Sequence, residues 1–166
     1  MLKIQLKQGL LFAGILFLFG TCSSQSISKW KITELEEYIK RSEQPVIVNF
    51  WATYCVPCIK EIPYFHEMVK KYENTGIKLM LVSLDFEESY PEKIKSFAIK
   101  RKFTAPIVWL DETNADYFCP RIDSSWSGVM PASLFVNNKT GYRHFIESEM
   151  TKEELESEIL KMTSAQ

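Results

Sequence analysis

The chain has 166 residues, of which 46% are hydrophobic and 25% are charged, and its formal net charge is -1. This length is sufficient for one globular domain with a buried core. The balanced charge argues against nucleic acid as a partner, because nucleic-acid binding usually requires a basic surface. Six glycines and seven prolines are too few for a low-complexity chain.

The first 22 residues have the form of a secretory signal. Lys3 and Lys7 precede an apolar run from Gly9 to Gly20, which is the order of charge and hydrophobicity in a signal peptide. The run is too short for a membrane span, which needs about 20 apolar residues. Cys22 follows in a setting that resembles a bacterial lipobox, so we predict a lipoprotein-type signal peptide with lipidation at Cys22. An ordinary signal peptide and a retained anchor are the alternatives, and each places the domain outside the cytoplasm.

The mature chain begins with a predicted tether and a first helix and strand. We expect residues 23–28 to be a short polar tether and residues 29–166 to be the folded domain. Thr33 and Glu36 are spaced as a capping box at the start of a helix. The apolar, β-branched run from Pro45 to Ala52 predicts a buried strand.

Further helices and strands alternate along the chain. In order, they are a helix over 56–72, a strand over 77–85, a helix over 91–102, a strand over 106–110, an irregular stretch over 111–128 with one or two helical turns, strands over 132–137 and 142–147, and a final helix that starts at a second capping box over 151–154. Pro63 should kink the first of these helices, because proline removes an amide donor. Alternating strands and helices predict a parallel sheet, and a turn at 138–141 makes the late strands an antiparallel hairpin.

A Cys-x-x-Cys pair, Cys55 and Cys58, directly follows the first buried strand. A zinc site would require further ligands at suitable spacing, and only Cys119 and His66 are available. A buried structural pair is disfavoured, because Pro57 and the start of a helix turn the thiols outward. At a helix N-terminus the unpaired amides and the dipole favour a thiolate, which lowers a thiol pKa from about 8.5 to about 3.5–7.5. We therefore expect Cys55 to attack a disulfide and Cys58 to resolve the mixed disulfide.

The surrounding segment resembles the active site of the thioredoxin superfamily. Residues 49–63 read N-F-W-A-T-Y-C-V-P-C-I-K-E-I-P. They are similar to F-W-A-T-W-C-x-P-C-x-x-E-x-P in the TlpA/ResA-like family of extracytoplasmic thiol–disulfide oxidoreductases. Residues 82–85 resemble the second strand of that family, and residues 126–135 resemble its loop with a cis-proline. The resemblance implies a thioredoxin-like three-layer α/β/α sandwich with a mixed central sheet, and it implies no cofactor.

The resemblance also implies roles for single residues. Pro131 corresponds to the cis-proline beside the cysteines, and the Met130 backbone should pair with an extended substrate segment. Glu61 corresponds to an acidic residue that tunes thiol protonation in this branch; the alternative is a solvated charge on the helix surface. Asn49 stands where cytoplasmic thioredoxins have a buried aspartate, so a base role falls to Glu61 or to water. Tyr54 replaces the usual tryptophan and can still shield the thiol.

These predictions favour a lipid-anchored thiol–disulfide oxidoreductase on the periplasmic face of a bacterial membrane. The expected substrate contacts are Tyr54, Val56, Pro57, Trp126 and Met130. Reduction of disulfides in target proteins is the direction that the resemblance favours. Because the periplasm is kept oxidising, a DsbD/CcdA-like membrane electron donor is the implied partner.

Two other functions remain as alternatives. The thiolates of the cysteine pair suit Cu(I) as soft ligands, but only Met130 and His66 are candidates for a third ligand, and no metal site is expected. A thiol peroxidase would need a proline at a set distance before the reactive cysteine, and the residues before Cys55 contain none there. Cys119 is expected to be a partly buried free thiol with no redox role.

Overall fold

A computed structural model describes residues 26–164 of the chain. Its strands form one mixed sheet in the order β1-β4-β3-β2-β5-β6. The strands are β1 (Ile27–Trp30), β2 (Val46–Trp51), β3 (Lys78–Ser83), β4 (Ile107–Leu110), β5 (Ala132–Asn137) and β6 (Tyr142–Ile146). The helices are α1 (Ile32–Arg41), α2 (Val56–Lys71), α3 (Glu92–Arg101), α4 (Ala115–Ile122) and α5 (Lys152–Ser164), with short 3-10 turns η1 (Glu73–Thr75) and η2 (Glu87–Ser89). The first four strands pair in parallel, whereas β5 runs antiparallel to β2 and β6.

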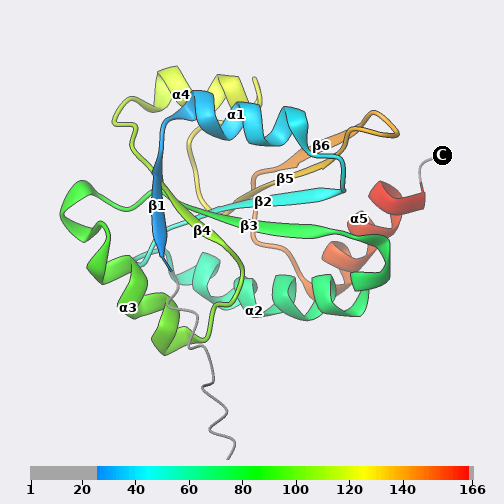
Figure 1. The fold of residues 1–166 in the computed structure, drawn as a ribbon, viewed down its shortest axis with the longest axis horizontal. Helices are drawn as coiled ribbons and strands as arrows, with labels where there is room; N and C mark the ends of the chain where they lie inside the picture. The colour runs from blue at the N-terminus through cyan, green and yellow to red at the C-terminus, as the bar shows by residue number, and fades with distance from the viewer. Residues whose placement is uncertain (1–25, 165–166) are drawn as a thin grey trace, which may run out of the picture.

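The helices cover both faces of the sheet. Figure 1 shows α1 and α4 on one face and α2, α3 and α5 on the other. Two hydrophobic clusters fill the two interfaces, one beneath α1 and α4 and one beneath α2, α3 and α5. This arrangement confirms the predicted three-layer α/β/α sandwich with a mixed central sheet.

Strand β2 lies in the interior of the sheet, between β3 and β5. All six of its residues are buried, as expected for a strand that is covered on both faces. Ile47 and Trp51 face the α2 side, while Val48 and Phe50 face the α1 side. Asn49 therefore also faces α2, because side chains alternate along a strand. A polar group thus lies inside the layer that contains the cysteine pair.

The edge strand β1 was not predicted. It pairs in parallel with β4, and Ile27 and Ser28 lie in it although they were assigned to the tether. The strand has only four residues, and its central pair, Ser28 and Lys29, is exposed. This short polar segment forms a strand because it pairs with β4, about 80 positions further along the chain. Its own sequence therefore does not predict a strand.

The predicted capping box at Thr33 and Glu36 is wrong. Helix α1 begins at Ile32, and the backbone N–H of Lys31 donates to Glu34 at 2.8 Å. The N–H of Ile32 donates to the Glu112 side chain at 3.0 Å. This tertiary contact satisfies an amide at the first residue of the helix, so the helix begins before the predicted capping box. The second capping box is confirmed, since Thr151 and Glu154 exchange backbone-to-side-chain hydrogen bonds at the start of α5.

The irregular stretch contains α4, which is eight residues long and corresponds to the predicted two helical turns. Pro63 lies inside α2. Within residues 26–164, the helices are all too short or too polar to cross a membrane.

Candidate active site

Cys55 and Cys58 are joined by a disulfide at the N-terminus of α2, with their Cα atoms 5.3 Å apart. Strand β2 ends at Trp51, and a turn closed by Cys55 N–H donating to Ala52 C=O places Cys55 at the N-cap of the helix. The Cys58 amide lies 3.3 Å from Cys55 Sγ. Cys55 is 8% exposed and Cys58 is fully buried. Both cysteines are therefore largely buried, so the expectation that both thiols turn outward is wrong for Cys58; only Cys55 keeps a small exposed surface, and an amide donor points at its sulfur.

Asp85 holds the loop that precedes Cys55. Its carboxylate accepts the Thr53 N–H at 3.1 Å, the Thr53 hydroxyl at 2.5 Å and the Ser83 hydroxyl at 2.8 Å. The Asp85 carbonyl oxygen accepts the Trp109 indole N–H at 2.7 Å. The end of β3 is thereby tied to the residues between β2 and α2.

The loop with Pro131 lies beside the cysteine pair. The Met130–Pro131 peptide bond is cis, as the resemblance implies. Pro131 is buried, and the Met130 side chain packs against the hydrophobic cluster that contains both cysteines. Gly128 adopts a φ of +92°, a left-handed conformation that strongly favours glycine.

Glu147 fixes this loop from outside. Its carboxylate accepts the Ser127 N–H at 3.1 Å, the Ser127 hydroxyl at 2.5 Å and the Val129 N–H at 2.9 Å. Partial burial opposes ionisation, but these donors prevail and lower the pKa of Glu147. A single carboxylate thus holds both arms of the turn that leads to Met130.

Replacing Glu147 with glutamine should loosen the loop. A neutral amide keeps one acceptor but loses the charge-assisted bonds, so we expect the free energy of unfolding to fall by about 1–2 kcal/mol. Chemical denaturation measures this change. Glu149→Gln is the matched control, because that carboxylate makes only an exposed ion pair with Lys60 and should have little effect. Equal changes in both variants would show that Glu147 does not hold the loop.

Glu61 is fully buried one helical turn after Cys58. Its Oε1 accepts the Asn49 side-chain amide at 2.9 Å, and its Oε2 accepts the Met150 N–H at 2.8 Å. Burial raises the pKa of Glu61 to about 7, although both hydrogen bonds oppose the rise. The alternative of a solvated surface charge is therefore wrong. A carboxyl with this pKa can release or take up a proton near neutral pH.

Asn49 couples Glu61 to the centre of the sheet. Its Nδ2 also donates to Ser133 Oγ at 3.0 Å, while its Oδ1 is buried and has no hydrogen-bond partner among the described residues. If Glu61 becomes protonated, rotation of the Asn49 amide presents Oδ1 to the new carboxyl O–H. Asn49 can thus serve either protonation state of Glu61 without a charge of its own.

The predicted substrate contacts fall into two groups. Tyr54 and Val56 are exposed on either side of Cys55, and Pro57 and Met130 are partly exposed. Trp126 points inward instead: its ring packs against Phe50, and its indole N–H donates to Val129 C=O at 3.0 Å. The prediction that Trp126 contacts the substrate is therefore wrong, and its side chain supports the proline loop instead. Packing against the neighbouring aromatic rings removes its apolar surface from water.

Cys119 is a free, buried thiol, as predicted. Burial raises its pKa to about 11, and nearby carboxylates add to the rise. A thiol with this pKa is a poor nucleophile at neutral pH.

Within residues 26–164, no three or more His, Cys, Asp or Glu side chains are grouped so that they could hold a metal ion. Cys22 lies outside the described residues.

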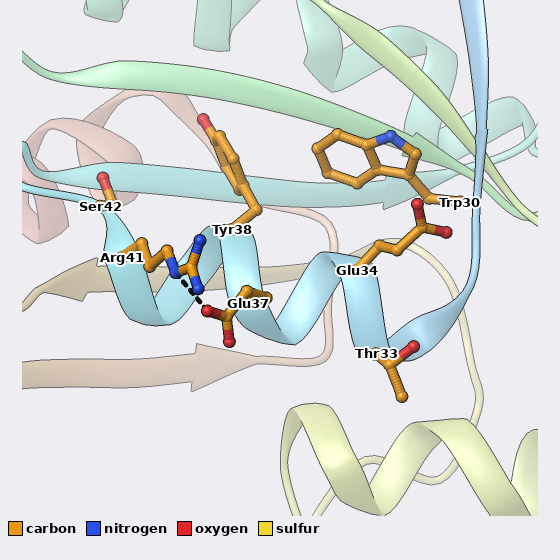
Figure 2. Close-up of a pocket in the computed structure, with 7 residues that line it drawn as sticks. All are labelled: Trp30, Thr33, Glu34, Glu37, Tyr38, Arg41 and Ser42. Atoms are coloured by element: carbon orange, nitrogen blue, oxygen red, sulfur yellow. Dashed lines mark ion pairs between the residues drawn. The ribbon is translucent and has the colours of Figure 1, made fainter.

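A separate groove of about 720 Å³ runs along α1. Figure 2 shows its lining residues, which come from α1, the end of β1 and Ser42, with Arg41 paired to Glu37. Helix α1 covers the face of the sheet opposite α2 (Figure 1). The groove therefore does not belong to the cysteine site.

Sequence reasoning assigned no role to Asp85, Phe86 or Glu147. Asp85 is the last residue of the segment 82–85, which resembles the second strand of the family. A carboxylate just after a buried strand could have been predicted as a site residue. The positions of Phe86 beside Tyr54 and of Glu147 beside Ser127 depend on contacts between distant segments.

A disulfide at a helix N-terminus, next to a cis-proline loop on a mixed sheet, defines a thioredoxin-like protein. Residues 23–140 match the AhpC/TSA family, and the chain belongs to that family. A curated relative, the thiol-disulfide oxidoreductase ResA of Bacillus cereus, is 30% identical over 119 residues. The match covers 71% of this chain and 63% of that protein, so it spans less than two thirds of the relative's length.

Solved structures agree with this fold. A thioredoxin-related protein from Neisseria meningitidis is 26% identical with a TM-score of 0.62, and the match covers 74% of this chain and 87% of that chain. StoA from Bacillus subtilis is 27% identical with a TM-score of 0.56, and the match covers 73% of this chain and 86% of that chain.

Proposed function

We propose that this protein is a thiol–disulfide oxidoreductase that reduces disulfides in target proteins through Cys55 and Cys58. The observation that carries the proposal is the disulfide at the N-terminus of α2, in which Cys55 keeps a small exposed surface and Cys58 is fully buried. The name of the ResA relative supports the same chemistry. The two sulfurs already occupy positions in which they exchange between dithiol and disulfide.

The reaction proceeds in two exchanges. The Cys55 thiolate attacks one sulfur of the substrate disulfide, which forms a mixed disulfide and releases one substrate thiolate. Cys58, as thiolate, then attacks Cys55 Sγ, which forms the Cys55–Cys58 disulfide and releases the second substrate thiolate. Two electrons pass from the protein to the substrate, and the released thiolates take up protons. The structure corresponds to the oxidised product.

Glu61 and Met130 assist at different points of this reaction. Glu61 takes the Cys58 proton, directly or through water, as the resolving thiolate forms. The Met130 backbone makes no hydrogen bond with the described residues, so its N–H and C=O are available to pair with an extended substrate segment. Tyr54 and Val56 contact the same segment beside Cys55.

The proposed location is the periplasmic face of a bacterial membrane. The signal over residues 1–22 and the lipobox-like Cys22 support a lipid anchor. An oxidising compartment requires an electron supply for a reductase, and a DsbD/CcdA-like membrane protein is the proposed donor. Labelling with a radioactive fatty acid, with Cys22→Ala as the control, tests the anchor.

The reduction potential of the Cys55–Cys58 couple tests the direction of the reaction. We expect a reduction potential of about -270 mV, the value of thioredoxin, from equilibration with a dithiol of known potential. A potential of about -120 mV would indicate an oxidant instead. Rapid consumption of hydrogen peroxide without reduction of insulin disulfides would replace the proposal with the peroxidase function.

A further inference from the structure

Large apolar side chains are exposed around the cysteine pair. Tyr54 and Val56 flank Cys55, Val129 precedes Met130, and Phe86 follows Asp85. The Tyr54 and Phe86 side chains are 53% and 65% exposed, and their rings stack with centroids 5.5 Å apart and an interplanar angle of 17°. This aromatic pair presents open ring surface next to the reactive sulfur.

The aromatic pair is held in place relative to Cys55. Tyr54 is the residue directly before Cys55, and Phe86 directly follows Asp85. The Asp85 carboxylate binds both the N–H and the hydroxyl of Thr53. The two rings therefore belong to segments that these hydrogen bonds hold together beside Cys55.

Two exposed carboxylates directly follow Phe86 in the chain. Glu87 and Glu88 begin the 3-10 turn η2 directly after Phe86, and both are exposed. Neither forms a salt bridge or a side-chain hydrogen bond with any residue of the described chain. Glu87 has an electrostatic effect on Lys31, but the Lys31 ammonium is paired with Asp111 at 2.8 Å. Other surface carboxylates, such as Glu149 and Glu156, have lysine partners.

We infer that Tyr54, Phe86, Glu87 and Glu88 form a subsite for a basic side chain of the polypeptide substrate, close to its reacting cysteine. The inference rests on the proposed function and names the kind of substrate that suits it. Aromatic faces attract cations, arginine most of all. The aliphatic stem of arginine or lysine covers the rings, while its charged end reaches the two carboxylates. An acidic side chain at the same place meets repulsion from both glutamates.

Matched disulfide peptides test the subsite. Each peptide contains one disulfide, and a single residue within two positions of the reacting cysteine is arginine, glutamine or glutamate. We expect the reduced protein to reduce the arginine peptide about two- to fivefold faster than the glutamine peptide, and the glutamate peptide to be the slowest. The preference should weaken as salt is added.

Variants identify the residues that are responsible. Glu87→Gln/Glu88→Gln and Phe86→Ala should each reduce the arginine preference. Glu43→Gln should keep it, because this exposed carboxylate lies before the start of β2, whereas Tyr54 follows the end of that strand. The ratio of rates within one variant cancels any change in the reactivity of Cys55. Equal rates for the three peptides, or an unchanged ratio in the double variant, would overturn the subsite alone. If the wild-type protein reduced none of the peptides, both the subsite and the proposed function would be rejected.

Discussion

Replacing Cys55 with serine is expected to remove all measurable reduction of insulin disulfides. A serine hydroxyl is not ionised at neutral pH and cannot form a mixed disulfide, so the first exchange does not occur. Cys58→Ser leaves the Cys55 nucleophile in place and removes the resolving thiol. That variant should therefore accumulate a covalent mixed disulfide with its substrate, visible on a non-reducing gel and released by a reductant.

Cys119→Ala provides the control for these two variants. Cys119 is buried next to Gly128 of the proline loop, and the proposed exchanges do not use it. Its loss should leave the reduction rate unchanged. Full turnover by Cys58→Ser, or loss of turnover in Cys119→Ala, would reject the mechanism with two cysteines.

Glu61→Gln should change how the stability of the protein depends on pH. The folded protein raises the pKa of Glu61 from 4.5 to about 7, so between these values the folded state holds a proton that the unfolded state has released. The free energy of unfolding therefore falls as the pH rises through this window. By pH 8, burial of the ionised carboxylate lowers the free energy of unfolding of the wild-type protein by about 3 kcal/mol. The glutamine variant has no such decrease, because its side chain does not ionise.

Denaturation of the disulfide form at pH 5 and pH 8 measures this difference, because Cys55 and Cys58 do not titrate in that form. The wild-type protein should lose about 2–3 kcal/mol more than Glu61→Gln between the two pH values. Rotation of the Asn49 amide lets the glutamine side chain keep its hydrogen bonds. Glu67→Gln, an exposed carboxylate on the same helix, should follow the wild type. Parallel profiles for wild type and Glu61→Gln would place the Glu61 pKa at its ordinary value.

Much of the site could be predicted because its signals are local. A buried strand, a Cys-Val-Pro-Cys segment and a helix start follow one another within about fifteen residues, and each is specified by residues close to it. The cis-proline loop followed from resemblance alone. Strand β1 was missed and Trp126 was assigned to the wrong surface, because both depend on contacts with remote segments.

The sequence by itself determined the reactive pair, since a thiol at the start of a helix meets its amide donors within one turn of the same chain. Only the tertiary structure decided which groups surround that pair. Glu61 is buried because Asn49 of β2 and the Met150 amide before α5 close over it. Likewise, Glu147 holds the proline loop and Phe86 stacks on Tyr54 across long stretches of chain. Burial and charge environment are properties of the assembled layers, and they therefore cannot be inferred from any one segment.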